Sequence, residues 1–176
     1  MGRLMIIKNI GFIGLGAMGS VMAPLIVKSG YIVHGYDIKA NIDKSSGVKQ
    51  VKDIKELSDL DVVIFMLPDG KIVSEVAKKL MDMNLKSIFI DMSSSDPQDT
   101  QALGIMLKNR GIRFLDAPVS GGVARAKTGD LMIMAGGDET HLKELDNLLS
   151  SMGNVQFAGP VSYTHLTLPT NGDVVV

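Results

Sequence analysis

The chain of 176 residues contains no cysteine. This absence excludes disulfide bonds, thiolate metal sites and cysteine nucleophiles, and it suits the reducing environment of a cytoplasm. An excess of one charge is also missing, because 18 Lys and Arg residues stand against 19 Asp and Glu residues. The totals give no sign of a nucleic-acid or anionic-membrane partner, so we expect neither partner, and we expect no metal.

Long hydrophobic runs are absent too. No segment approaches the roughly 20 apolar residues that a membrane helix requires. The apolar stretch before Lys8 is too short for the central region of a signal peptide. The length matches a single folded domain, and we expect the protein to be cytoplasmic.

Short apolar and β-branched runs alternate along the chain with segments of helical spacing. Each run is bounded by Gly, Pro, Asp or Ser, which is typical of a buried strand. The runs cover residues 9–15, 31–36, 61–67, 87–92, 113–119, 131–137 and 154–159. Single apolar stripes between the runs, such as Val73, Val76, Ala77 and Leu80, predict helices that each cover one face of a sheet.

Helix ends carry the expected signals. Asp96 and Pro97 predict the N-cap and first residue of a helix. Glycines just past three helices predict their ends: Gly30, Gly111 and Gly153. The polar stretch 41–60 predicts a shortened helix, a short strand near Val48 and another short helix. The alternation as a whole predicts an α/β fold, a Rossmann-type doubly wound, mostly parallel sheet with helices on both faces.

A glycine motif follows the first predicted strand and opens the first helix. Gly14 provides a tight turn, Gly16 lets a pyrophosphate approach the backbone, and Gly19 lets the helix pack closely on the strand. The free N–H groups and the positive end of the helix dipole then face the phosphates. A GxGxxG pattern alone is weak evidence, but its place between a strand and a helix favours a dinucleotide site.

Asp37 ends the second predicted strand, close to the separation of about 20 residues at which an acid binds the ribose hydroxyls of a dinucleotide. A carboxylate at this place repels a 2′-phosphate. The sequence therefore predicts NAD rather than NADP, although Lys39 weakens that preference. The alternative for Asp37 is an ordinary turn or helix-capping role.

The ends of the next two strands are expected at the cleft where the strand order reverses. Met66, Leu67 and Pro68 are predicted to line the adenine or ribose side, and Ser93 or Ser94 to form hydrogen bonds near the nicotinamide. Core packing of the apolar residues and helix capping by the serines are the alternatives.

A second glycine cluster follows the strand predicted at 113–119. Ser120, Gly121 and Gly122 combine a hydroxyl with two amides that carry no side chain, a natural cradle for a carboxylate. By itself, the cluster fits a glycine-rich loop without a ligand equally well.

Four segments occur together in the order and spacing of one family: "IGFIGLGAMGSVMA", "VVIFMLPDG", "IDMSSSDP" and "DAPVSGGVARAKTGDLMIMAGG". From about Lys8 to Pro160 the chain resembles the β-hydroxyacid dehydrogenases, of the 3-hydroxyisobutyrate dehydrogenase and 2-hydroxy-3-oxopropionate reductase type. The 6-phosphogluconate dehydrogenases share the fold. One departure is Ala124-Arg125, where relatives usually carry Gly-Ala, and it leaves substrate specificity open.

The resemblance implies a role for each matching residue. The cofactor-binding residues would be Gly14, Gly16, Gly19, Asp37, Met66, Leu67, Pro68 and Ser94. The substrate carboxylate would bind at Ser120, Gly121 and Gly122. The reaction would move a hydride between NAD and a small β-hydroxyacid, and the full-length protein would form a homo-oligomer.

The resemblance also implies a catalytic lysine on a helix just beyond the strand at 154–159, which leads into an all-helical second domain. No residue of this chain matches that lysine, and we expect the second domain to be absent. Lys127 lies in the carboxylate loop, and His165 lies in a tail with no helical or strand pattern. We therefore expect an inactive cofactor-binding part of a dehydrogenase.

The tail from Val161 reads "VSYTHLTLPT" at its start. Its codons can be written so that they resemble a transposon-end adaptor used in preparing DNA sequencing libraries. We therefore expect an NAD-binding domain at 1–160 and a non-native tail at 161–176 that takes no part in the fold. A divergent natural C-terminus is the alternative.

Two other functions remain open from the sequence. The chain could be a non-catalytic dinucleotide-binding module in which the lysine is naturally missing. An imine reductase would keep the cofactor loop but usually alters the Ser-Gly-Gly cluster.

Overall fold

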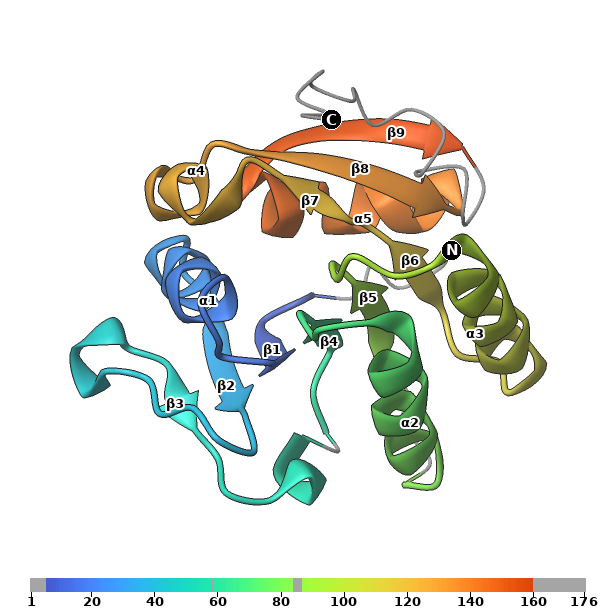
Figure 1. The fold of residues 1–176 in the computed structure, drawn as a ribbon, viewed down its shortest axis with the longest axis horizontal. Coiled ribbons are helices and arrows are strands. Elements are labelled where there is room, and N and C mark those ends of the chain that lie inside the picture. The colour runs from blue at the N-terminus through green and yellow to red at the C-terminus, as the bar shows by residue number, and fades with distance from the viewer. Residues whose placement is uncertain (1–5, 58, 84–86, 160–176) are drawn as a thin grey trace, which may run out of the picture.

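The structure is a computed structural model, and it describes residues 6–57, 59–83 and 87–159. Strands and helices alternate along these residues (Figure 1). The strands are β1 (Asn9–Ile13), β2 (Ile32–Tyr36), β3 (Lys49–Gln50), β4 (Val62–Phe65), β5 (Ile88–Asp91), β6 (Phe114–Asp116), β7 (Val119–Ser120), β8 (Leu131–Gly137) and β9 (Gly153–Gly159). The α-helices are α1 (Gly19–Lys28), α2 (Gly70–Met81), α3 (Pro97–Asn109), α4 (Gly122–Thr128) and α5 (Glu139–Ser150).

One nine-stranded sheet joins all the strands. From β3 to β6 the order is β3-β2-β1-β4-β5-β6, and every neighbouring pair in this part is parallel. The order reverses between β1 and β4, which is where a doubly wound fold binds its ligand. The predicted fold class is therefore confirmed.

Helices cover both faces of this sheet. The four residues of β4 are all buried, and they alternate between two core clusters because successive side chains point to opposite faces. One cluster contains apolar residues of α1 and α5, and the other contains apolar residues of α2 and α3. This two-sided burial explains why the parallel strands read as continuous apolar runs.

The far part of the sheet is mixed. β6 and β7 both pair antiparallel with β8, in one constant register, so they form a single bent strand interrupted at Ala117 and Pro118. Ala117 donates its N–H to the carbonyl oxygen of Asp91 in β5 at 2.7 Å. Pro118 has no N–H to donate, so the strand leaves β5 there and continues along β8. The last strand, β9, pairs parallel with β8.

Local predictions agree with the structure in most places. Asp96 is the N-cap of α3, and its carboxylate accepts a hydrogen bond from the N–H of Gln98. The polar stretch 41–60 forms two short 3-10 helices, η1 (Lys44–Ser46) and η2 (Ile54–Leu57), with β3 between them. No helix within the described residues is long and apolar enough to cross a membrane.

Two local predictions were wrong. Gly153 does not end a helix but begins β9, where a side chain would collide with the backbone of Leu131. Residues 122–128, predicted as part of a loop, form α4, which a left-handed Gly129 terminates. The glycine cluster before α4 concealed this short helix, since glycines usually indicate loops.

Candidate functional site

The glycine motif forms the turn between β1 and α1. Gly14 has a φ of +100°, a left-handed conformation that favours glycine. Its N–H donates a hydrogen bond of 2.9 Å to the carbonyl oxygen of Tyr36 at the end of β2. A side chain on Gly14 would collide with the carbonyl oxygen of Met66, which follows β4. The turn is thus fixed against both neighbouring strands.

The other two glycines of the motif differ in their surroundings. A side chain on Gly19 would collide with the carbonyl oxygen of Gly14, so the start of α1 packs directly on the turn. No atom lies within 4 Å of the position that a Cβ of Gly16 would occupy. Gly16 therefore presents bare backbone to open space beside the start of α1, as the approach of a pyrophosphate requires.

Asp37 connects the end of β2 to the same turn. Its Oδ2 accepts a hydrogen bond from the N–H of Leu15 at 2.8 Å, and its Oδ1 accepts two from the N–H groups of Lys39 and Ala40, both at 2.7 Å. Burial favours the neutral acid, but the N–H groups of Ala40, Lys39 and Leu15 outweigh it and lower the pKa of Asp37. A carboxylate has about four lone-pair sites, so Oδ2 can still accept a hydrogen bond from a ribose hydroxyl.

The ends of β4 and β5 lie against this turn. Leu67 donates its N–H to the Oγ of Ser93 at 2.9 Å. Asp91 is fully buried at the end of β5, and both of its carboxylate oxygens bind the serine segment. Oδ1 accepts a hydrogen bond from the N–H of Ser93 at 2.9 Å, and Oδ2 accepts one from the hydroxyl of Ser95 at 2.8 Å. The sequence interpretation did not single out Asp91. The sequence signal for Asp91 was its place as the one acidic residue at the end of an otherwise apolar strand.

The structure separates the two candidate serines. Ser93 is buried and its hydroxyl binds Leu67, whereas Ser94 is exposed. Met66 and Leu67 are half-buried and pack partly against the two core clusters, and Pro68 is exposed. The structure thus brings together the turn at Gly14, Asp37, the segment from Met66 to Pro68 and the serines after β5. Their contact with a cofactor stays a prediction.

The predicted carboxylate-binding residues lie at the end of β7, beyond the parallel part of the sheet. Ser120, Gly121 and Gly122 are all exposed, and both glycines have left-handed backbone, with φ of +126° and +63°. The loop leads directly into α4, which lies beside α1 (Figure 1). α4 thus contacts the helix that begins at the cofactor turn.

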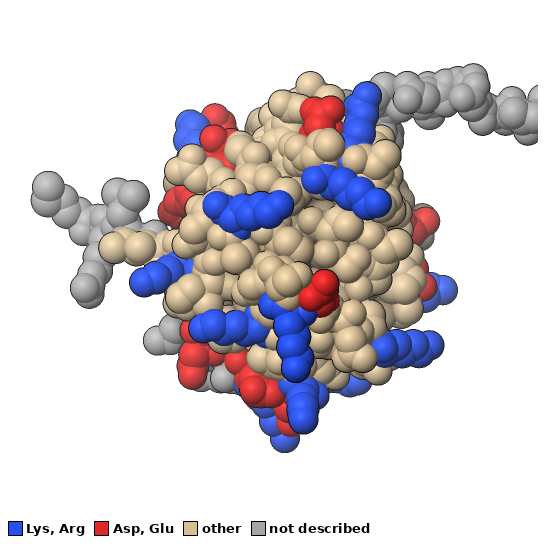
Figure 2. All heavy atoms as spheres, turned by 90° about the vertical axis from the view of Figure 1, so that its left-hand side faces the viewer, with Lys and Arg blue, Asp and Glu red and all other residues tan. Residues whose placement is uncertain are grey.

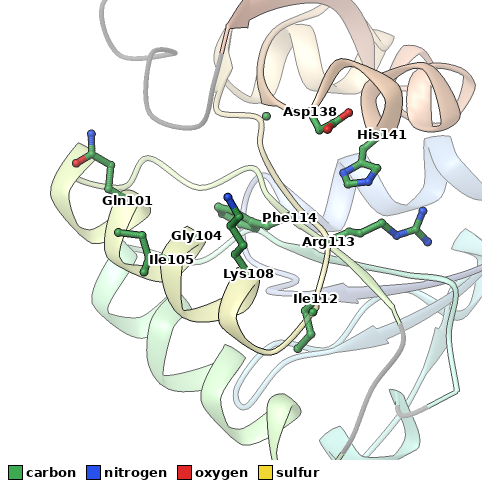
Figure 3. Close-up of a pocket in the computed structure, with 11 residues that line it drawn as sticks. Gln101, Gly104, Ile105, Lys108, Ile112, Arg113, Phe114, Asp138 and His141 are labelled. Atoms are coloured by element: carbon green, nitrogen blue, oxygen red, sulfur yellow. The ribbon is translucent and has the colours of Figure 1, made fainter.

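A pocket of about 670 Å³ lies elsewhere, between α3 and the start of α5. Figure 3 shows Gln101, Ile105 and Lys108 on α3 across from Asp138 and His141. None of the predicted site residues lines this pocket. Arg113 at this pocket is paired at 2.8 Å with Glu144. The strand-end geometry described above is therefore the stronger candidate site.

Comparison with known proteins identifies the family. Residues 9–164 match the family of the NAD binding domain of 6-phosphogluconate dehydrogenase. The chain belongs to this family. Membership confirms the resemblance predicted from the four sequence segments, and it confirms NAD as the cofactor of this family's domain.

Similar proteins include several hydroxyacid dehydrogenases. The chain is 37% identical over 152 residues to the mitochondrial 3-hydroxyisobutyrate dehydrogenase of Drosophila melanogaster, covering 83% of this chain and 47% of that protein. It is 34% identical over 153 residues to the 2-(hydroxymethyl)glutarate dehydrogenase of Eubacterium barkeri, covering 82% and 51%. The solved structure of Mycobacterium tuberculosis 3-hydroxyisobutyrate dehydrogenase with L-serine has a TM-score of 0.87 and 31% identity, covering 92% and 57%. The chain thus spans about half the length of these relatives.

Proposed function

We propose that this chain is the cofactor-binding half of an NAD-dependent β-hydroxyacid dehydrogenase. One observation carries the proposal: the turn after β1 leaves the backbone of Gly16 open to a pyrophosphate, while Asp37 is held beside it by the N–H of Leu15. The relatives that share this domain are, by name, dehydrogenases of small hydroxyacids.

The residues of the site would divide the binding of NAD among them. Gly14, Gly16 and Gly19 shape the turn for the pyrophosphate, and the ionised Asp37 accepts a hydrogen bond from the adenosine ribose. The pKa of Asp37 is not raised toward neutrality, so its carboxylate is charged at neutral pH and disfavours the 2′-phosphate of NADP. The apolar segment from Met66 to Pro68 and the exposed Ser94 would contact the cofactor further along.

Ser120, Gly121 and Gly122 would bind the substrate carboxylate with one hydroxyl and two backbone N–H groups. NAD bound here would supply hydride transfer to or from the carbon that carries the substrate hydroxyl. The hydroxyl proton requires a general acid or base, and the family lysine that fills this role has no counterpart in this chain. We therefore propose that the 176-residue chain turns over little or no substrate.

The boundaries and setting belong to the same proposal. Residues 1–160 would be the NAD-binding domain, and residues 161–176, which lie outside the described residues, a non-native tail. The parent protein would be a cytoplasmic homo-oligomer whose second half supplies the lysine.

Sequencing decides between this function and a non-catalytic NAD-binding module. The source DNA is amplified across the codon for Pro160 by a library-free method and read onward. A glycine turn followed by a lysine-bearing helix supports the dehydrogenase. Codons for "VSYTHLTLPT" in the gene itself would contradict the dehydrogenase and favour the module.

Binding is measured on the chain as it stands, by titration calorimetry with NAD and with NADP. We expect NAD to bind more tightly than NADP. Absence of NAD binding would overturn the proposed cofactor site.

A further inference from the structure

Arg125 lies against the loop proposed to bind the substrate carboxylate. The position that a Cβ of Gly121 would occupy is 2.7 Å from the Cδ of Arg125 and 3.0 Å from its Cβ. The aliphatic part of Arg125 therefore covers Gly121, and its guanidinium begins one bond beyond Cδ. The same position at Gly122 has no atom within 4 Å, so this side of the loop is open.

The charge of Arg125 is not neutralised by the fold. Within the residues that the structure describes, the ion pairs join Arg113 to Glu144 and Lys143 to Glu139, and no carboxylate lies within 4.0 Å of the Arg125 guanidinium. Arg125 is exposed. Figure 2 shows several Lys and Arg side chains and few acidic ones in the middle of the face that contains α1 and α4. The exposed Arg125 adds a positive charge beside this loop.

The loop and Arg125 together offer more donors than one carboxylate uses. Ser120, Gly121 and Gly122 supply a hydroxyl and two N–H groups, which suffice to orient one carboxylate with neutral donors. A guanidinium adds a full charge and five N–H donors in a planar fork that matches a carboxylate in two parallel hydrogen bonds. We infer that Arg125 binds a second carboxylate, so that the substrate is a hydroxyacid with two acidic groups.

This inference rests on the proposed function, and two hydroxyacids of matched structure test it. 3-Hydroxyisobutyrate and 2-(hydroxymethyl)glutarate share a hydroxymethyl group next to a carboxylate, but only the second has another carboxylate. Each is titrated into the ¹⁵N-labelled chain saturated with NAD, and the amide signals of Gly121 and Gly122 report binding. We expect the dicarboxylate to bind about tenfold more tightly, the effect of one charged hydrogen-bonded contact.

Variants assign the preference to Arg125. Arg125→Ala should remove the preference for the dicarboxylate by weakening its binding more than that of 3-hydroxyisobutyrate, and Arg125→Lys should retain part of the preference. Lys127→Ala is the matched control, because two residues along a helix place a side chain on roughly the opposite side, and the preference should survive this change. The amide spectrum of each variant shows whether it is folded.

The possible outcomes distinguish a failure of this inference from a failure of the proposed function. If both hydroxyacids shift Gly121 and Gly122 with equal affinity, or if Arg125→Ala weakens both equally, the second-carboxylate inference is overturned and the carboxylate loop stands. If NAD binds but neither hydroxyacid shifts these amides, the carboxylate loop itself is overturned, and the inference fails with it.

Discussion

The three glycines of the turn after β1 are required for different physical reasons. Gly14 needs its left-handed φ and has the carbonyl oxygen of Met66 against it, so Gly14→Ala should lower the free energy of unfolding by about 2 kcal/mol or more. Gly16 faces open space, so Gly16→Ala should leave stability within about 0.5 kcal/mol and still weaken NAD binding. Urea unfolding and calorimetry measure the two effects.

Of these two variants, Gly16→Ala tests the position of the pyrophosphate. Its added methyl group meets nothing in the protein, so any loss of NAD affinity reports on a ligand that approaches the backbone there. A Gly16→Ala chain that binds NAD as well as the unchanged chain would contradict the placement of the pyrophosphate.

Asp37 links the stability of this turn to pH. Its pKa is lowered in the folded chain, so its contribution to stability is fully present above the unfolded pKa of about 3.9 and is lost as the pH falls through the lower folded value. The free energy of unfolding should therefore fall below about pH 4. Asp37→Asn should flatten this part of the profile, measured by urea unfolding at several pH values. An unchanged slope would show that Asp37 is not the group responsible.

These residue roles differ in how far the sequence could predict them. The turn at the glycine motif and the position of Asp37 beside it could be predicted, because backbone geometry dictates both residue type and spacing. The position of Arg125 over Gly121 could not be predicted, because it depends on the conformation of a side chain on α4. The glycines before α4 concealed this helix in the sequence.

At the scale of elements, the loops after β4 and β5 are held together by one hydroxyl. Ser93→Ala leaves the N–H of Leu67 without its acceptor, so it should destabilise the chain by about 1–3 kcal/mol. Ser94→Ala changes an exposed side chain and should leave stability nearly unchanged while lowering NAD affinity. Thermal unfolding and calorimetry of both variants measure this. Equal stability loss in the two variants would contradict the separation of their roles.

The parallel arrangement of the strands from β3 to β6 could be predicted, but the mixed edge could not. Parallel strands buried on both faces read as apolar runs, and alternation with helices then fixes their connection. The alternation does not predict the antiparallel pairing of β8, which runs along β6 before Pro118 and along β7 after it, while the contact of this strand with β5 ends at Ala117. A proline within an apolar run marks an interruption, but it does not tell which partner the strand takes beyond it.

At the scale of the whole molecule, the last element of the described residues is β9, a partly exposed strand. β9 pairs with β8, it has no charged residue, and Phe157 on it is 48% exposed. Uncharged edge strands pair readily with further strands. We expect the chain to self-associate, and Phe157→Lys should shift its gel-filtration peak toward the monomer. A monomeric peak for the unchanged chain would contradict this expectation.

Binding and turnover should be separable in the whole chain. NAD at 100 times its dissociation constant should stabilise the fold by about 2.7 kcal/mol, which corresponds to a rise in melting temperature of about 5–10 °C. The chain mixed with NAD and 3-hydroxyisobutyrate should nevertheless form NADH at least about 100-fold more slowly than a chain extended by the lysine-bearing second half that we propose for the parent protein, because a general acid or base typically contributes that much. Stabilisation without turnover is the result that the proposed function predicts. Comparable turnover by the 176-residue chain would mean that a group within it handles the proton, and the missing lysine would then no longer account for the chemistry.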